Sequence, residues 1–175
     1  MEKRKFSGGI VIASLLIIAQ YILAFFVYKL PGYKPLQWVG WVIWAVSLIF
    51  GLAPIFILRQ KGEVEKGNSY VNTRKLVDTS LYAIIRHPQY MGGILFNVAL
   101  MLLAQHWLIL LLGTISAVLI WLEIQMADQE CIVKFGDEYR RYMQRVPQVN
   151  FLLGVIRLIR ARYAKLNETT GHPQR

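Results

Sequence analysis

Cysteine, histidine and acidic residues are scarce in this sequence. The 175 residues include one cysteine, Cys131, three histidines, and ten acidic residues against twenty lysines and arginines. A single cysteine excludes an internal disulfide and a multi-cysteine zinc site. Because the three histidines are also far apart in the chain, we expect no metal site. Charged residues make up 17% of the chain, below the roughly 25% of an average soluble domain.

Long runs without Asp, Glu, Lys or Arg are the main feature that is present. Residues 6–28 and 36–58 are two such runs of 23 residues each. About 20 residues are enough for a helix to cross the hydrocarbon core of a membrane. The basic residues before the first run resemble a signal peptide, but the run is longer than a typical signal-peptide core. We therefore interpret both runs as retained membrane helices.

The third uncharged run, residues 88–122, is too long for one crossing. As a single helix it would be roughly 52 Å long. We interpret it as a helical hairpin that turns at Gln105 and His106, with spans at about residues 84–105 and 107–126. The predicted fold is therefore all-α: an integral membrane bundle of about four transmembrane helices, followed by cytoplasmic C-terminal helices.

The basic residues are distributed very unevenly between the two sides of this bundle. Only Lys29 and Lys34 fall in the loop between the first two spans, whereas the other eighteen lie on the opposite side. This asymmetry predicts that both termini are cytoplasmic. No RNA- or DNA-binding motif is present. The net charge of +10 therefore reflects this topology and anionic lipid headgroups rather than nucleic acid.

The cytoplasmic part of the chain divides into four segments. Residues 60–79 are polar and rich in Gly and Asn, which predicts a loop. Residues 126–145 read as a helix that continues the fourth span, and residues 151–162 as an amphipathic helix lying in the membrane interface. We expect one domain over residues 1–165 and a disordered tail over residues 166–175.

Polar residues at the membrane edge are the candidates for chemistry. Arg86 and His87 precede Pro88, which favours the first turn of a helix. A cationic pair beside a helix N-terminus makes a binding corner for a carboxylate or a phosphate. The alternative is that these residues, with Tyr90, anchor the helix at the interface. The hairpin would bring Glu123 to the depth of Arg86, as a functional pair or as a structural ion pair. Asp128 and Glu130, which follow Glu123, alternatively form a solvated face.

Two sequence blocks resemble a family of membrane methyltransferases. The first runs from Leu76-Val77 through Leu81-Tyr82 to Arg86-His87-Pro88-Gln89-Tyr90-Met91-Gly92. The second runs from Phe135-Gly136-Asp137-Glu138-Tyr139-Arg140-Arg141-Tyr142 to Val146-Pro147. In this order and spacing they are similar to isoprenylcysteine carboxyl methyltransferases and phospholipid N-methyltransferases. The chain departs from the family pattern at Ser80, where the family has glycine, and at Glu123, which stands near a family arginine.

The resemblance implies methyl transfer from S-adenosylmethionine at the cytoplasmic membrane face, by a helical membrane protein rather than a Rossmann fold. It implies catalytic roles for Arg86, which would orient the acceptor or the cofactor, and for Glu123. The cofactor-binding residues that it implies are Leu76, Val77, Tyr82, His87, Tyr90, Gly92, Asp128 and Glu130. The acceptor would be a lipid or a lipidated small molecule that enters laterally between helices.

Three alternatives to an isoprenylcysteine-like methyltransferase stay open. In the first two, the protein is a methyltransferase of the same family whose acceptor is a phospholipid amine or a small thiol. If it is an amine, Glu123 or Asp128 would serve as the base. The third alternative is a non-catalytic membrane scaffold. The sequence shows no repeat and no mid-membrane polar pattern, which argues against a transporter but not against a scaffold. The sequence leaves the acceptor and the oligomeric state open.

Overall fold

In the computed structural model, residues 8–28 and 32–169 are described, and all their regular elements are helical. In chain order they are α1 (Gly8–Val27), α2 (Lys34–Lys61), the short 3-10 helix η1 (Ser80–Ala83), α3 (Pro88–Ala104), α4 (Trp107–Phe135), α5 (Asp137–Arg145) and α6 (Phe151–Thr169). This confirms the predicted all-α class. The basic residues near the N-terminus, Lys29, and residues 170–175 lie outside the described residues. The predicted cytoplasmic position of both termini therefore stays a prediction.

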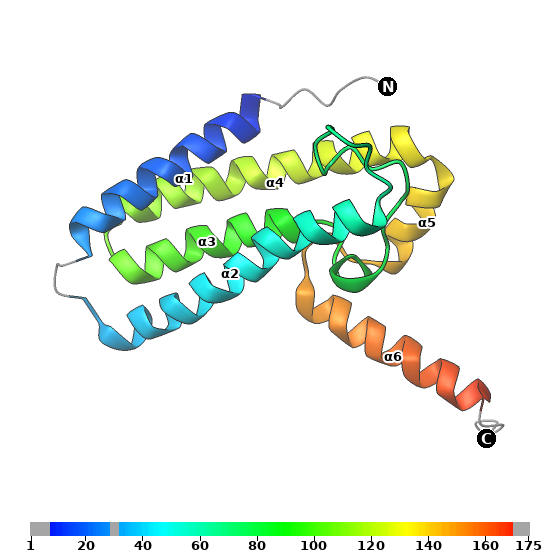
Figure 1. Ribbon diagram of the computed structural model, residues 1–175. Helices are drawn as coiled ribbons and strands as arrows, with labels where there is room; N and C mark the ends of the chain where they lie inside the picture. Colours follow the sequence, from blue (N-terminus) through cyan, green and yellow to red (C-terminus); the bar gives the residue numbers. More distant parts are fainter. Residues whose placement is uncertain (1–7, 29–31, 170–175) are drawn as a thin grey trace.

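The first four long helices lie side by side as a bundle (Figure 1). Helix α2 packs along α3, α1 packs along α4, and α3 and α4 form the hairpin between these pairs. Three of the helices, α1, α2 and α4, are long and apolar enough to cross a membrane. Helix α3 is apolar but has only 17 residues, which is at the short end of the range for a crossing helix.

The start of α3 differs from the sequence prediction. We expected the third span to begin near residue 84, whereas the helix begins at Pro88. The proline ring disfavours the helical conformation for the residue before it, and His87 has φ −123° and ψ 63°. Residues 84–87 therefore form a non-helical connection between η1 and α3, which frees Arg86 and His87 from helical geometry.

The predicted hairpin turn is confirmed at Gln105 and His106. Gln105 ends α3 in the left-handed conformation, with φ 47°, and the Nδ1 atom of His106 accepts a hydrogen bond from the amide of Leu108. The Gln105 side chain also accepts from the Tyr33 amide and donates to the Tyr33 carbonyl, both at 2.9 Å. These two bonds attach the turn to the beginning of α2.

The bundle is apolar outside and carries polar groups inside. Many large apolar side chains on the outer faces are exposed. Among them, Phe25, Trp38 and Phe56 are each more than 70% exposed. Fully buried Gln20 instead donates from Nε2 to the carbonyl of Ile109 at 3.1 Å. A soluble monomer rarely exposes so much continuous apolar surface. The arrangement suits a bundle surrounded by lipid, where internal polar groups help hold helices together.

Two expectations for the C-terminal part are wrong. Residues 126–145 are not one helix, because Gly136 has φ 57° and separates α4 from α5. Glycine takes this positive φ without the penalty that a Cβ atom brings. Residues 166–169, expected to be disordered, belong to α6. Asn150 begins this helix by accepting the Leu153 amide at 3.0 Å.

Candidate functional site

The buried carboxylate of Asp128 on α4 is the centre of a polar network. His87 Nε2 lies 2.7 Å from Asp128 Oδ1, and Tyr139 donates its hydroxyl to the same oxygen at 2.5 Å. Arg86 Nη2 and Gln148 Nε2 donate to Oδ2 at 3.0 and 2.8 Å. One side chain therefore joins the segment before α3, helix α4, helix α5 and the segment after α5.

The two segments that flank this carboxylate also bond through their main chains. The amide of Arg86 donates to the carbonyl of Pro147 at 2.9 Å, and the amide of His87 donates to the carbonyl of Gln148 at 3.1 Å. The Arg86 guanidinium also donates from Nη1 to the Met143 carbonyl at 3.3 Å. The two sequence blocks that carry the family resemblance, far apart in the chain, therefore meet at one point.

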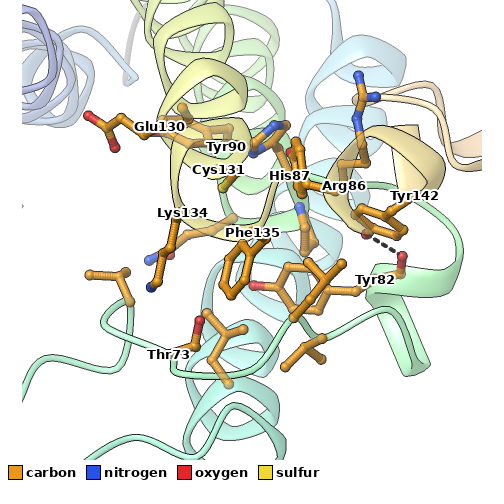
Figure 2. A pocket seen from close by; sticks show the side chains of 18 of the residues that line it. Thr73, Tyr82, Arg86, His87, Tyr90, Glu130, Cys131, Lys134, Phe135 and Tyr142 are labelled. Carbon is orange, nitrogen blue, oxygen red and sulfur yellow. Dashed lines mark hydrogen bonds between the residues drawn. The ribbon is translucent and has the colours of Figure 1, made fainter. Parts of the chain in front are cut away.

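A cavity of about 670 Å³ opens beside this network. Its size lies within the roughly 300–1,000 Å³ that is typical of small-molecule sites. Figure 2 shows side chains around it from the loop before η1, from η1, from the start of α3, and from α4 and α5. Aromatic rings make up much of the wall: Tyr82, Tyr90, Phe135, Tyr139 and Tyr142.

Two tyrosines on this wall, Tyr139 and Tyr142, are fixed as hydrogen-bond donors. Burial raises the pKa of the Tyr139 and Tyr142 phenols well above their ordinary value, so both stay protonated at neutral pH. Tyr139 donates to Asp128, and Tyr142 donates to the main-chain carbonyl of Tyr82 at 2.6 Å (Figure 2). These bonds hold α5 against the α4 end of the cavity and against η1.

Most of the residues singled out from the sequence are brought together here. The cavity wall includes seven of the ten: Leu76, Val77, Tyr82, Arg86, His87, Tyr90 and Glu130. Asp128 lies behind the wall and acts on it through Arg86 and His87. Glu123 and Gly92 are not among the residues that line the cavity.

The ion pair of Arg86 is with Asp128 and not, as the hairpin spacing predicted, with Glu123. The Arg86 and Asp128 side chains are both buried, with N and O 3.0 Å apart. Glu123, also buried, lies five positions earlier on α4, about 7.5 Å deeper along the helix axis. Because α3 begins only at Pro88, Arg86 lies beyond the helix end, level with Asp128 rather than with Glu123.

Gly92 contributes to helix packing. It is buried on α3, and a Cβ atom added there would lie 2.7 Å from the main-chain nitrogen of Gly51 on α2. Glycine at this position therefore allows α2 and α3 to approach closely, as small residues do between membrane helices. Gly92 therefore packs against α2 and is not among the residues that line the cavity.

Two kinds of site residue were missed from the sequence. Tyr139 and Tyr142 belong to the second block, and their spacing of three on a short helix was a signal that both face inward. Gln148 contacts Asp128 and exchanges hydrogen bonds with Gln125 at 3.2 and 3.3 Å. No local pattern marked Gln148, because its role depends on a main-chain contact with a distant segment.

Ser80 stands at the position where the resembled family has glycine, and its conformation explains that preference. Its φ is 58°, in the left-handed region, which costs a residue with a Cβ atom roughly 1–2 kcal/mol. The hydroxyl of Ser80 accepts a hydrogen bond from Lys61 Nζ, which also donates to Thr79. The main chain at Ser80 is therefore strained, and the exposed hydrogen bond from Lys61 offsets part of this strain.

We expect Ser80→Gly to stabilise the protein by about 0.5–1 kcal/mol, because it relieves this backbone strain. Lys61 keeps Thr79 as a partner, so little is lost with the hydroxyl. Thermal unfolding of the purified protein in detergent measures the effect. Ser80→Ala is the matched comparison: it removes the hydroxyl but keeps the strain, and it should not raise the melting temperature. Equal effects of the two substitutions would contradict this account.

Comparison with known proteins gives a consistent set of relatives. A family model described as phospholipid methyltransferase matches residues 35–135. Protein-S-isoprenylcysteine O-methyltransferase B of Arabidopsis thaliana is 29% identical over 169 residues, covering 81% of this chain and 78% of that protein. Methanethiol S-methyltransferase 1 of Bradyrhizobium diazoefficiens is 40% identical over 67 residues, 38% of this chain and 22% of that protein.

A second methanethiol S-methyltransferase of Bradyrhizobium diazoefficiens is 29% identical over 114 residues, 65% of this chain and 43% of that protein. The chain thus spans less than half the length of both of these thiol methyltransferases. No solved structure matches the chain. The family model covers more than half of the sequence and includes the third and fourth helices and the residues of the first block. The chain belongs to the phospholipid methyltransferase family.

Proposed function

We propose that this protein transfers a methyl group from S-adenosylmethionine to a lipophilic acceptor at the cytoplasmic membrane face. The observation that carries the proposal is the cavity at which the two sequence blocks meet, with Asp128 bonded to Arg86, His87, Tyr139 and Gln148 behind its wall. Family membership and the methyltransferase names of the relatives support the reaction class.

The residues of the cavity fit the chemical groups of this cofactor. The Nε atom of Arg86 is buried and has no hydrogen-bond partner within the part of the chain that the structure describes. It is a donor suited to the cofactor carboxylate. The aromatic rings of Tyr82, Tyr90 and Phe135 on the wall suit an adenine ring and a sulfonium cation. Glu130, also on the wall, supplies an acceptor for an amino group or ribose hydroxyls.

When bound, S-adenosylmethionine supplies an activated methyl group on its sulfonium. The protein's own task is then mainly alignment and exclusion of water, since direct displacement needs the reacting atoms held in line. Asp128 accepts a hydrogen bond from Nε2 of His87, which fixes the orientation of the ring at the cavity wall. The same carboxylate holds the Arg86 guanidinium in place beside the cavity. Glu123 stays a candidate catalytic residue deeper on α4.

For the acceptor we favour a lipid or lipidated molecule that reaches the cavity from the membrane. The similarity to an isoprenylcysteine methyltransferase over 81% of this chain supports it. A small thiol is the second candidate, because the local identity to a methanethiol methyltransferase reaches 40%. Either a carboxylate or a thiolate is a competent acceptor without a strong base in the protein.

We expect His87→Ala to weaken binding of S-adenosylmethionine and S-adenosylhomocysteine by about tenfold or more, because a hydrogen-bonded group on the wall is lost. Tyr90→Phe should weaken it by a smaller factor. Isothermal titration calorimetry on the detergent-purified protein measures both. His106→Ala and Tyr33→Phe are the matched controls, because these residues precede the first turns of α4 and α2. Those two helix ends lie at the end of the bundle opposite α5 (Figure 1).

Saturable micromolar binding that His87→Ala weakens would support the site, whereas unchanged affinity in both cavity variants would exclude it. Absence of binding in detergent and in nanodiscs would favour a non-catalytic scaffold. With binding established, transfer of a labelled methyl group to a prenylated cysteine, a phosphatidylethanolamine or a small thiol distinguishes the acceptors. Label must appear in the acceptor with wild-type protein and fall with His87→Ala, whereas the His106→Ala control should keep it.

A further inference from the structure

Helix α6 carries an exposed apolar stripe. Leu152, Ile156, Ile159, Tyr163 and Leu166 are all exposed, from 47% for Ile159 to 73% for Leu152. Their alternating spacing of four and three residues places them on one face of the helix. Figure 1 shows α6 leaving the bundle at a steep inclination to the four packed helices, with its C-terminal half clear of them.

The stripe faces away from the bundle. Gly154, which is buried, follows Leu152 by two residues, about 200° around the helix and therefore opposite the stripe. A Cβ atom at Gly154 would lie 2.0 Å from the main-chain oxygen of Ile84, so this side of α6 is pressed against the segment before α3. In the first turns of α6, the protein's own bundle therefore covers the Gly154 side and leaves the stripe open.

The first turns of α6 lie at the depth of a membrane helix. The ring of Phe151 packs edge-on against Phe50 of α2, with centroids 5.5 Å apart. Phe50 comes eleven residues before Lys61, so this contact is about 16 Å along α2 from its end. Residues 151–156 carry no charge, and the first basic residue of α6 is Arg157.

Basic side chains border the stripe on both sides. By helical position, Arg160 and Arg162 flank the line from Leu152 to Leu166, and both are exposed. Arg157 is held differently, because it donates to the main-chain carbonyl of Gln144 at 3.1 Å. The open face is therefore apolar along its centre and positive at both margins.

We propose that α6 docks obliquely into an anionic membrane leaflet, at the end of the bundle that holds the cavity. The apolar stripe enters the acyl region, starting at the depth of Phe50, and Arg160 and Arg162 extend to the lipid phosphates. Long basic side chains combine an apolar stem with a charged head, which suits this boundary. The charge complementarity favours anionic lipid over a second copy of α6, whose equal arginines would repel. This docking does not depend on the methyl-transfer proposal.

The test is hydrogen exchange of the full-length protein in nanodiscs. Amides in residues 157–169 should exchange about tenfold more slowly in mixed phosphatidylcholine and phosphatidylglycerol than in phosphatidylcholine alone. Substituting both Arg160→Gln and Arg162→Gln should abolish most of the difference. The matched control is Arg140→Gln with Arg141→Gln, which removes two exposed arginines of α5 and should keep the difference. High salt should reduce the effect in the wild-type protein.

Three results would overturn the proposal. Equal protection in the two lipid mixtures would show insertion without selection of anionic headgroups. Protection that rises with the number of protein molecules per nanodisc would point to a second copy on the stripe. Loss of the lipid difference in the α5 control as well would show a general charge effect. Calorimetric binding of the methyl donor, measured on the same variants, separates failure of the docking from failure of the proposed function.

Discussion

Asp128→Ala is expected to be the most destabilising substitution of a polar residue in this protein, at about 3–5 kcal/mol. The substitution leaves the buried Arg86 guanidinium without its counter-charge, and an uncompensated buried charge carries a cost of this size. It also removes the acceptor for His87, Tyr139 and Gln148, so the contact between the two sequence blocks loosens. Thermal unfolding followed by tryptophan fluorescence in a mild detergent measures the loss.

The matched control for Asp128 is Asp137→Ala on α5. Asp137 also pairs with an arginine, Arg140 at 2.7 Å, but both side chains are mostly exposed. Such surface pairs contribute only about 0.2–1 kcal/mol. A double substitution of Arg86 and Asp128 by alanine should cost less than the sum of the single ones, because no charge is then left buried. Similar losses for Asp128→Ala and Asp137→Ala would contradict the network.

Gly92→Ala is expected to destabilise the protein, whereas Gly93→Ala is expected to be neutral or stabilising, although the two glycines are adjacent on α3. At Gly92 the added methyl group would meet the main chain of α2 at Phe50 and Gly51, at 2.7–3.1 Å. A main chain has no rotamer that moves aside, so the helices must separate. Overpacking of this kind costs typically about 1–3 kcal/mol.

At Gly93 the added methyl group would meet only the Cδ1 atom of Ile120, at 3.4 Å. Alanine is favoured over glycine inside a helix by up to about 1 kcal/mol, so Gly93→Ala should be neutral or stabilising. The two variants are compared by thermal unfolding under the same detergent conditions. A loss of stability of similar size at both positions would show that helix flexibility, and not the α2–α3 contact, explains these glycines.

The sequence determined the helical class and much of the layout because the signals for these features are local. A run without charges has one stable form in lipid, the helix, in which every main-chain group bonds within the segment. The turn at Gln105 and His106 followed from length alone, since residues 88–122 exceed one crossing. The resemblance to known motifs likewise identified seven of the residues that line the cavity, because residue type and spacing carry it.

Only the tertiary structure decided which partner each of those residues takes. Two facts set the pairing of Arg86: α3 starts at Pro88, and the segment after α5 bonds to the main chain of Arg86 and His87. Gln148 and the packing role of Gly92 depend on contacts between segments distant in the chain. Hydropathy places a helix in a membrane, but it does not distinguish between partners five residues apart on α4, such as Glu123 and Asp128. A buried ion pair at 3.0 Å requires the correct register.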